Sequence, residues 1–195
     1  AHHSVLATAE ITLEANPDDI NDLQLAQWKK AGINRLSIGV QSFREKDLRW
    51  MNRAHSATQS LTAIQLASTY FDNITIDLIY GVPGLSVTDW EKNIDIALSL
   101  NIHHLSCYAL TVEPKTPLEK LIRTEQKETT DPDLQAQHFA ILVDRLEKAG
   151  FLHYEISNFG KPGFESRHNR SYWQGKHYSG IGPSAHSYNG VSRQW

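Results

Sequence analysis

The chain has 195 residues, 40% hydrophobic and 21% charged, which is enough for one globular domain with a sizeable core. Its formal net charge of −3 gives no electrostatic argument for binding nucleic acid or a membrane surface. The single cysteine, Cys107, excludes an intramolecular disulfide and any site that needs several thiolates from this chain. No apolar run of membrane-spanning length and no signal peptide is visible, so we expect a cytoplasmic protein.

The first part of the chain alternates between strand and helix patterns. Residues 10–17 form a short alternating strand that Pro17 stops, and Asp18 or Asn21 then begins a helix that ends at Gly32. A second strand follows, with small or polar side chains on one face and apolar ones on the other. The expected strands are residues 10–17 and 35–42, and the expected helices are residues 18–31, 45–52 and 58–70.

Residues 73–80 are the segment around which the rest of the chain is organised. They alternate as a buried strand, turn residues end it at 81–84, and Ser86 then caps a helix that runs to about Leu100. Asp77 lies inside this strand, where packing alone would favour an apolar residue. Burying an unpaired carboxylate costs several kcal/mol, so we expect a bound group or another part of the chain to pair with it.

The remaining elements complete an α/β order. A strand is predicted at 104–110, a short helix at 118–123, a longer helix between Asp131-Pro132 and Gly150, and a fifth strand at 154–157. Four to five strand–helix alternations predict an α/β fold with a parallel sheet, and both an open doubly wound sheet and a barrel fit this order.

Polar side chains share one face of three predicted strands. By strand parity, Glu14, Gln41 and Asp77 fall on the face opposite the apolar side chains, each at the carboxyl end of its strand. Ligands bind at this edge in parallel α/β folds. The pattern therefore predicts a ligand site, although side chains that only hydrogen-bond one another would give the same pattern.

The last thirty residues mix imidazoles, aromatic rings and glycines. Such a mixture suits a flat aromatic ligand, with rings for stacking and an imidazole as an iron ligand. A glycine-rich loop anchored by its aromatic side chains explains the same composition.

Several separate motifs, in the same order, resemble radical SAM proteins of the oxygen-independent coproporphyrinogen III oxidase family. These motifs are residues 13–17, 35–43, 52–53 and 76–83. The segment 168–173, His-Asn-Arg-Ser-Tyr-Trp, resembles the HNxxYW motif of the haem chaperone branch rather than the oxidase branch. The resemblance implies a partial (β/α) barrel with parallel strands.

The resemblance also implies which residues bind ligands. The positions that match S-adenosylmethionine contacts are Glu14, Gln41, Arg53 and Asp77, with Thr111 and His186 as weaker candidates because their residue types differ from those of the oxidase. The haem-binding positions are His168, Asn169, Tyr172 and Trp173. From group chemistry, Glu14 suits the amino group of the ligand, Arg53 its carboxylate, and Gln41 and Asp77 its ribose or other polar parts.

One departure from the family is large. Family members hold a [4Fe–4S] cluster through a CxxxCxxC loop, and one cysteine cannot supply three thiolates. We therefore expect residues 1–195 to be the central part of a (β/α)6-type domain whose N-terminal strands are missing, with 151–195 forming its C-terminal edge. No catalytic and no metal-binding residue is expected in this chain, which alone should be inactive.

The leading expectation is a fragment of a haem chaperone in the porphyrin and haem pathway. It would bind haem as cargo, together with S-adenosylmethionine, for delivery to acceptor haemoproteins. The alternatives are an oxygen-independent coproporphyrinogen III oxidase and a non-catalytic α/β binding module. The sheet edge left by the missing strands could pair with a partner, including a second copy in a homodimer.

Overall fold

The computed structural model describes residues 4–195, which fold around a six-stranded sheet of order β1-β2-β3-β4-β6-β5. The first four strands are parallel, and the last two join antiparallel at one edge. Their bounds are β1 Thr12–Ala15, β2 Arg35–Gln41, β3 Ile74–Tyr80, β4 His104–Ala109, β5 Leu152–His153 and β6 Asn158–Gly160. The sheet is therefore open and mostly parallel.

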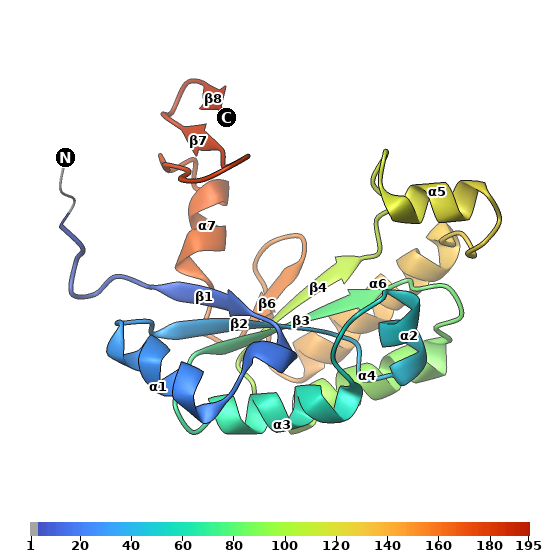
Figure 1. Cartoon of the computed structure of the whole chain (residues 1–195). Coiled ribbons are helices and arrows are strands. Elements are labelled where there is room, and N and C mark those ends of the chain that lie inside the picture. Colours follow the sequence, from blue (N-terminus) through green and yellow to red (C-terminus); the bar gives the residue numbers. More distant parts are fainter. Residues whose placement is uncertain (1–3) are drawn as a thin grey trace.

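The helices divide between the two sides of the sheet. In Figure 1, α1, α3 and α4 lie below the sheet, while α7 and a small hairpin stand above one end of it and α5 above the other. A 3-10 turn, η1 (Pro17–Asp19), precedes α1. The helices are α1 Asp22–Lys30, α2 Glu45–Trp50, α3 Ala57–Ala67, α4 Val87–Ser99, α5 Pro117–Arg123, α6 Pro132–Lys148 and α7 Arg167–Trp173; the hairpin strands are β7 Ser187–Tyr188 and β8 Arg193–Gln194.

The core confirms the predicted apolar face. Alternate side chains of β2 and β3 are at most 8% exposed and pack towards the helices, as Leu36, Ile38, Ile74 and Ile76 show. Cys107 is buried with them as a small hydrophobic residue. Helices cover this face of the sheet. The alternate, more polar side chains of each strand therefore point to the opposite, open face.

Local signals placed most helix starts correctly. The side chains of Asn21, Ser86 and Asp131 accept the expected capping hydrogen bonds, and Pro132 takes the first position of α6. Within residues 4–195, no helix combines the length and apolar character needed to cross a membrane.

The predicted fifth strand is wrong. Residues 154–157 form a turn that joins β5 to β6, and both strands run antiparallel to their neighbours. The physical reason is Glu155, whose carboxylate accepts hydrogen bonds from the Ser157 amide at 2.9 Å and from the Asn158 side chain. These contacts close the chain on itself where the residue pattern suggested an extended strand.

The predicted position of Asp77 at a strand end is also wrong. β3 continues for three residues beyond it, and Leu78, Ile79 and Tyr80 all pair with β4. Asp77 therefore lies in the middle of the sheet, where it is less accessible to water than a residue at the edge.

Candidate functional site

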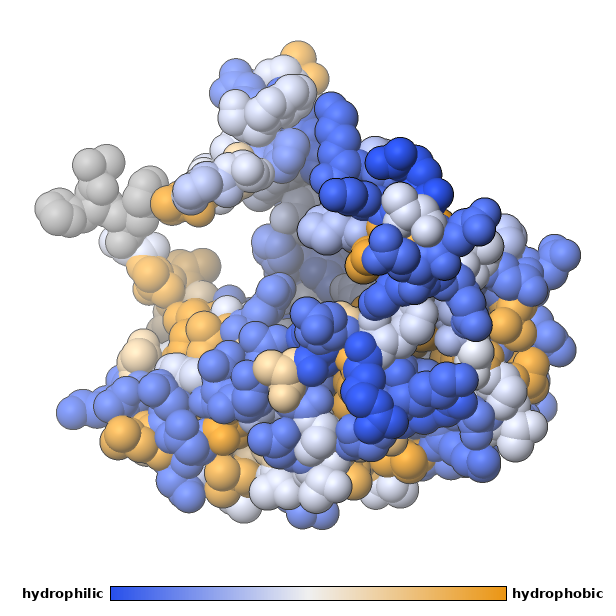
Figure 2. Space-filling model, turned by 45° about the vertical axis from the view of Figure 1, so that its right-hand side comes forward, coloured by the Kyte–Doolittle hydropathy of each residue, from blue (hydrophilic) through white to orange (hydrophobic). Residues whose placement is uncertain are grey.

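A cavity of about 300 Å³ opens on the polar side of the sheet. Its walls come from the four parallel strands, from the chain that enters β1, and from the start of α7. Figure 2 shows the molecule hollowed between the sheet and the segments that stand above it. The lining residues are Glu10, Thr12, Glu14, Arg35, Ser37, Asp77, Ser106, Tyr108, Ser166, His168 and Asn169.

Asp77 is one of three carboxylates that line this cavity, with Glu10 and Glu14. The Ser37 hydroxyl donates to it at 3.2 Å, and among residues 4–195 it forms no ion pair. Burial raises the pKa of Asp77 to about 6, against the lowering effect of hydrogen bonds from Ser106 and Ser37. A carboxylate held in this way favours a ligand that donates hydrogen bonds or carries positive charge.

Arg35, which was not predicted as a site residue, contributes to the cavity wall from the start of β2. It is 4% exposed, and its guanidinium donates to the hydroxyl of Thr75. Burial lowers the pKa of Arg35, and nearby acidic groups, Glu10 first among them, oppose that shift. Strand parity alone could have identified Arg35, because it shares the polar face of β2 with Ser37.

Gln41 and Arg53 lie beyond the cavity, at the carboxyl end of β2. Both approach Gly39: a β-carbon there would be 2.9 Å from Gln41 Nε2 and 3.5 Å from an Arg53 guanidinium nitrogen. Arg53 also donates to Asn16 Oδ1 at 2.7 Å. Gly39 and Ser37 share one face of β2, about 7 Å apart by strand geometry. The polar side chains therefore form two groups and not a single rim. One group lines the cavity, and the other surrounds Gln41 at the carboxyl end of β2.

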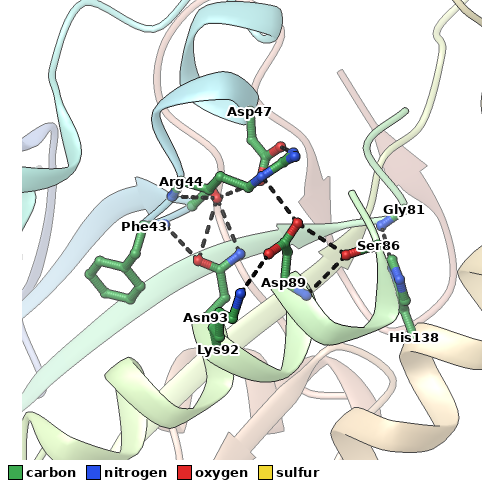
Figure 3. A network of polar contacts seen from close by, with 10 residues as sticks. Phe43, Arg44, Asp47, Gly81, Ser86, Asp89, Lys92, Asn93 and His138 are labelled. Atoms are coloured by element: carbon green, nitrogen blue, oxygen red, sulfur yellow. Dashed lines mark hydrogen bonds and ion pairs between the residues drawn. The ribbon is translucent and has the colours of Figure 1, made fainter. Parts of the chain in front are cut away.

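Gln41 has a backbone φ of 68°, in the left-handed region that non-glycine residues rarely adopt. A buried network holds the chain immediately after it (Figure 3). Asn93 accepts the Phe43 amide at 2.8 Å and donates to the Ser42 hydroxyl at 3.2 Å. Ser42 in turn donates to Asp47 at 2.8 Å, so the strained end of β2 is fastened to both α4 and α2.

Arg53 also borders a second and more apolar groove of about 760 Å³. Ile79 and Leu110, at the carboxyl ends of β3 and β4, contribute to its floor, and α2 and α5 form its sides. Arg53 therefore borders an apolar groove at the carboxyl end of the sheet, outside the polar cavity.

The HNxxYW segment forms α7, which spans Arg167–Trp173. His168 and Asn169 face the cavity, whereas Tyr172 and Trp173 are 43% and 59% exposed. The Tyr172 hydroxyl lies 2.9 Å from His168 Nε2, and Trp173 donates its indole N–H to Glu155 at 3.1 Å. The His168 imidazole therefore lines the cavity, and the exposed rings of Tyr172 and Trp173 lie on the same helix outside its lining.

Thr111 and His186 do not join either group of polar residues. Thr111 is exposed after β4, where its hydroxyl donates to the Ala109 carbonyl at 3.3 Å. His186 is exposed before β7, with its ring 5.5 Å from that of Trp195. Neither lines the cavity.

The residues present do not fit an iron–sulfur cluster. Cys107 is 1% exposed, and burial raises the pKa of its thiol, which disfavours the thiolate that binds iron. In the described part of the chain, no three His, Cys, Asp or Glu side chains are grouped as metal ligands.

Comparisons with known proteins identify the class to which this fold and site belong. The radical SAM superfamily model matches residues 4–97. The structure of Escherichia coli coproporphyrinogen III oxidase (HemN), a radical SAM enzyme, superposes with a TM-score of 0.76 at 23% identity, covering 95% of this chain and 45% of that one. The match places residues 4–97 in the radical SAM superfamily, and the open sheet has the fold of a partial barrel of the radical SAM type.

Within that class the chain is similar to HemW haem chaperones over most of its length. It is 40% identical over 95% of its residues to "Heme chaperone HemW" of Bacillus subtilis. It is also 40% identical, over 92% of its residues, to "Radical S-adenosyl methionine domain-containing protein 1, mitochondrial" of Mus musculus. The chain spans about half the length of these curated relatives, 49% and 41% respectively.

Proposed function

We propose that this chain is the S-adenosylmethionine- and haem-binding part of a radical SAM haem chaperone. One observation carries the proposal: His168 and Asn169 of the HNxxYW segment open onto the same cavity as Glu14 and Asp77. The two sets of residues lie far apart in the sequence. A shared cavity is what a protein needs if one ligand is to be held beside the other.

The charges of the cavity and groove suit S-adenosylmethionine. Glu14 is exposed to the cavity and pairs with no cation among residues 4–195, so it can receive the ligand's ammonium group. Asp77 and Gln41 can accept from ribose hydroxyls, and Arg53 can bind the carboxylate. The apolar groove beside Arg53 offers room for the nucleobase. The cluster that would cleave the bound ligand belongs, in this proposal, to the rest of a longer protein.

The haem site is proposed on α7. His168 is exposed and can ligate iron through Nδ1, or through Nε2 once the Tyr172 hydroxyl moves aside. The exposed rings of Tyr172 and Trp173 can lie against the porphyrin face. Because this site is on the surface, bound haem remains within reach of an acceptor haemoprotein.

A haem titration of the full-length protein tests the proposal. We expect His168→Ala to lower haem affinity at least tenfold and to shift the Soret band, because the iron loses its ligand. His177→Ala removes another exposed imidazole, outside the cavity, and should match the parent. An unchanged affinity and spectrum for His168→Ala would remove this residue from the haem site.

Calorimetric titration with S-adenosylmethionine tests the second ligand. Asp77→Ala and Glu14→Gln should each weaken binding by the tenfold or more that a lost charge-assisted hydrogen bond is worth, about 1.5–3 kcal/mol. If Asp77→Ala binds as well as the parent, the polar side chains only satisfy one another. Anaerobic turnover of coproporphyrinogen III by the reconstituted protein would instead identify an oxidase.

Two further features of the proposal concern the setting of the protein. We propose a cytoplasmic location, which fractionation can test against the mitochondrial location that the name of the Mus musculus relative carries. We also propose that β1, which lies at the edge of the sheet, can pair with a partner or with a second copy. The molar mass of the protein in solution measures the second possibility.

A further inference from the structure

Helix α7 is held in place by polar contacts. None of its seven residues is buried, whereas α3, α4 and α6 each bury apolar side chains in the core. Figure 1 shows it standing away from the sheet with only its first turn close to the strands. The contacts at that first turn therefore decide where His168 lies.

One of these contacts is the end of a buried hydrogen-bonded chain that crosses three strands. Arg35 of β2 donates to the Thr75 hydroxyl of β3, which lies 2.9 Å from His104 Nδ1 on β4. His104 Nε2 lies 2.7 Å from the Tyr154 hydroxyl. That hydroxyl also accepts the backbone N–H of Ser166 at 3.2 Å, and Ser166 caps α7.

The direction of each hydrogen bond follows from its neighbours. A guanidinium can only donate, so the Thr75 oxygen accepts from Arg35, which leaves its own proton free to be directed to His104 Nδ1. His104 is fully buried, and burial, together with the charge of Arg35, lowers its pKa to about 3, which keeps it neutral. When Nδ1 accepts from Thr75, the N–H of the neutral ring is on Nε2 and points to Tyr154, whose oxygen then accepts from both His104 and Ser166.

We infer that His104 and Tyr154 are positioning residues for the haem site, since they fix the first turn of α7 and through it the imidazole of His168. This inference rests on the proposed haem function. The Ser166 hydroxyl accepts the Asn169 amide at 3.2 Å, so the residue that Tyr154 holds also sets the turn containing His168. The next residue, Glu155, accepts the indole N–H of Trp173 and so holds the other end of α7.

The test is Tyr154→Phe in the full-length protein, because it removes one hydroxyl and keeps the ring. The matched control is Tyr70→Phe, which removes a hydroxyl that donates to Asp22 at 3.0 Å away from the cavity. We expect Tyr154→Phe to weaken haem binding roughly tenfold, because the variant loses the hydrogen bonds of the hydroxyl to His104 and to the Ser166 amide. We also expect faster amide hydrogen exchange across residues 167–173. Tyr70→Phe should change neither.

Two readouts separate this inference from the haem proposal. The inference is overturned if Tyr154→Phe leaves both haem affinity and amide exchange at the parent values. It is also overturned if His168→Ala abolishes haem binding while Tyr154→Phe speeds exchange without weakening that binding. If His168→Ala itself binds haem normally, the proposed haem site is wrong. Faster exchange in Tyr154→Phe would then show only that Tyr154 stabilises α7.

Discussion

Asp77→Asn is expected to stabilise the unliganded protein at alkaline pH. Asp77 has a pKa of about 6 in the folded state against its ordinary value of 3.8, because it is buried without a cationic partner. An asparagine keeps the shape and can still hydrogen-bond the Ser37 hydroxyl, but it carries no charge to desolvate. The gap between the two pKa values corresponds to about 3 kcal/mol, which is the upper limit of the gain.

The pH dependence of this gain has a definite sign. Between pH 3.8 and about 6 the folded state binds more protons at Asp77 than the unfolded state does, so the parent loses stability as pH rises through this window. The advantage of Asp77→Asn should therefore be full at pH 8 and absent below pH 3.8. Urea denaturation at several pH values, followed by tryptophan fluorescence, measures it as a shift in midpoint with an unchanged slope.

Asp89→Asn is the matched control. Hydrogen bonds from Lys92 and Ser86 lower the pKa of this partly exposed carboxyl, so its contribution to stability is present at neutral pH and lost on acidification. Its substitution should lower stability at pH 8, the opposite sign.

If Asp77→Asn is no more stable than the parent at pH 8, Asp77 is not a desolvated, unpaired carboxylate and the argument for a ligand beside it fails. The stabilised variant should also bind S-adenosylmethionine more weakly, the trade expected at a functional site.

Three further substitutions test the surroundings of the site. Gln41→Gly should keep stability or raise it by up to about 1 kcal/mol in denaturation, because glycine accepts a φ of 68°, while weakening S-adenosylmethionine binding in calorimetry. Asn93→Ala should lower the free energy of unfolding by about 2–3 kcal/mol, since it leaves the buried Phe43 amide unpaired; an unchanged urea midpoint would contradict this. Gly81→Ala should lower the melting temperature, because its β-carbon would lie 2.2 Å from Gln135 Cγ at a φ of 71°; an unchanged melting temperature would show that Gln135 simply moves aside.

Local pattern was sufficient for most of the fold. The alternation of Ile74, Ile76 and Leu78 determined which face of β3 is buried, because successive side chains of a strand point to opposite sides. Ser86 and Asp131 marked helix starts because a capping side chain bonds to an amide only three residues away or fewer. These features need no knowledge of distant parts of the chain.

Strand parity also reached part of the candidate site. It placed Glu14 and Asp77 on one face, and both line the cavity. Strand parity could not predict that Gln41 lies outside the cavity. The irregular pairing between Ile38 and Gln41 and the left-handed backbone of Gln41 arise only when β2 is fastened to α2 and α4.

What the sequence by itself determined was the alternation of strands and helices, the sealed face of the sheet, and the motifs of a radical SAM protein. Only the tertiary structure decided that α7 closes over the same cavity as β1. Glu10 accepts the amide of Arg167 across 157 residues of chain, and Tyr154 holds Ser166 through a turn that the residue pattern made look like a strand. Such contacts depend on how the sheet brings distant segments of the chain together in space. The local pattern of apolar and polar residues holds no information about those positions.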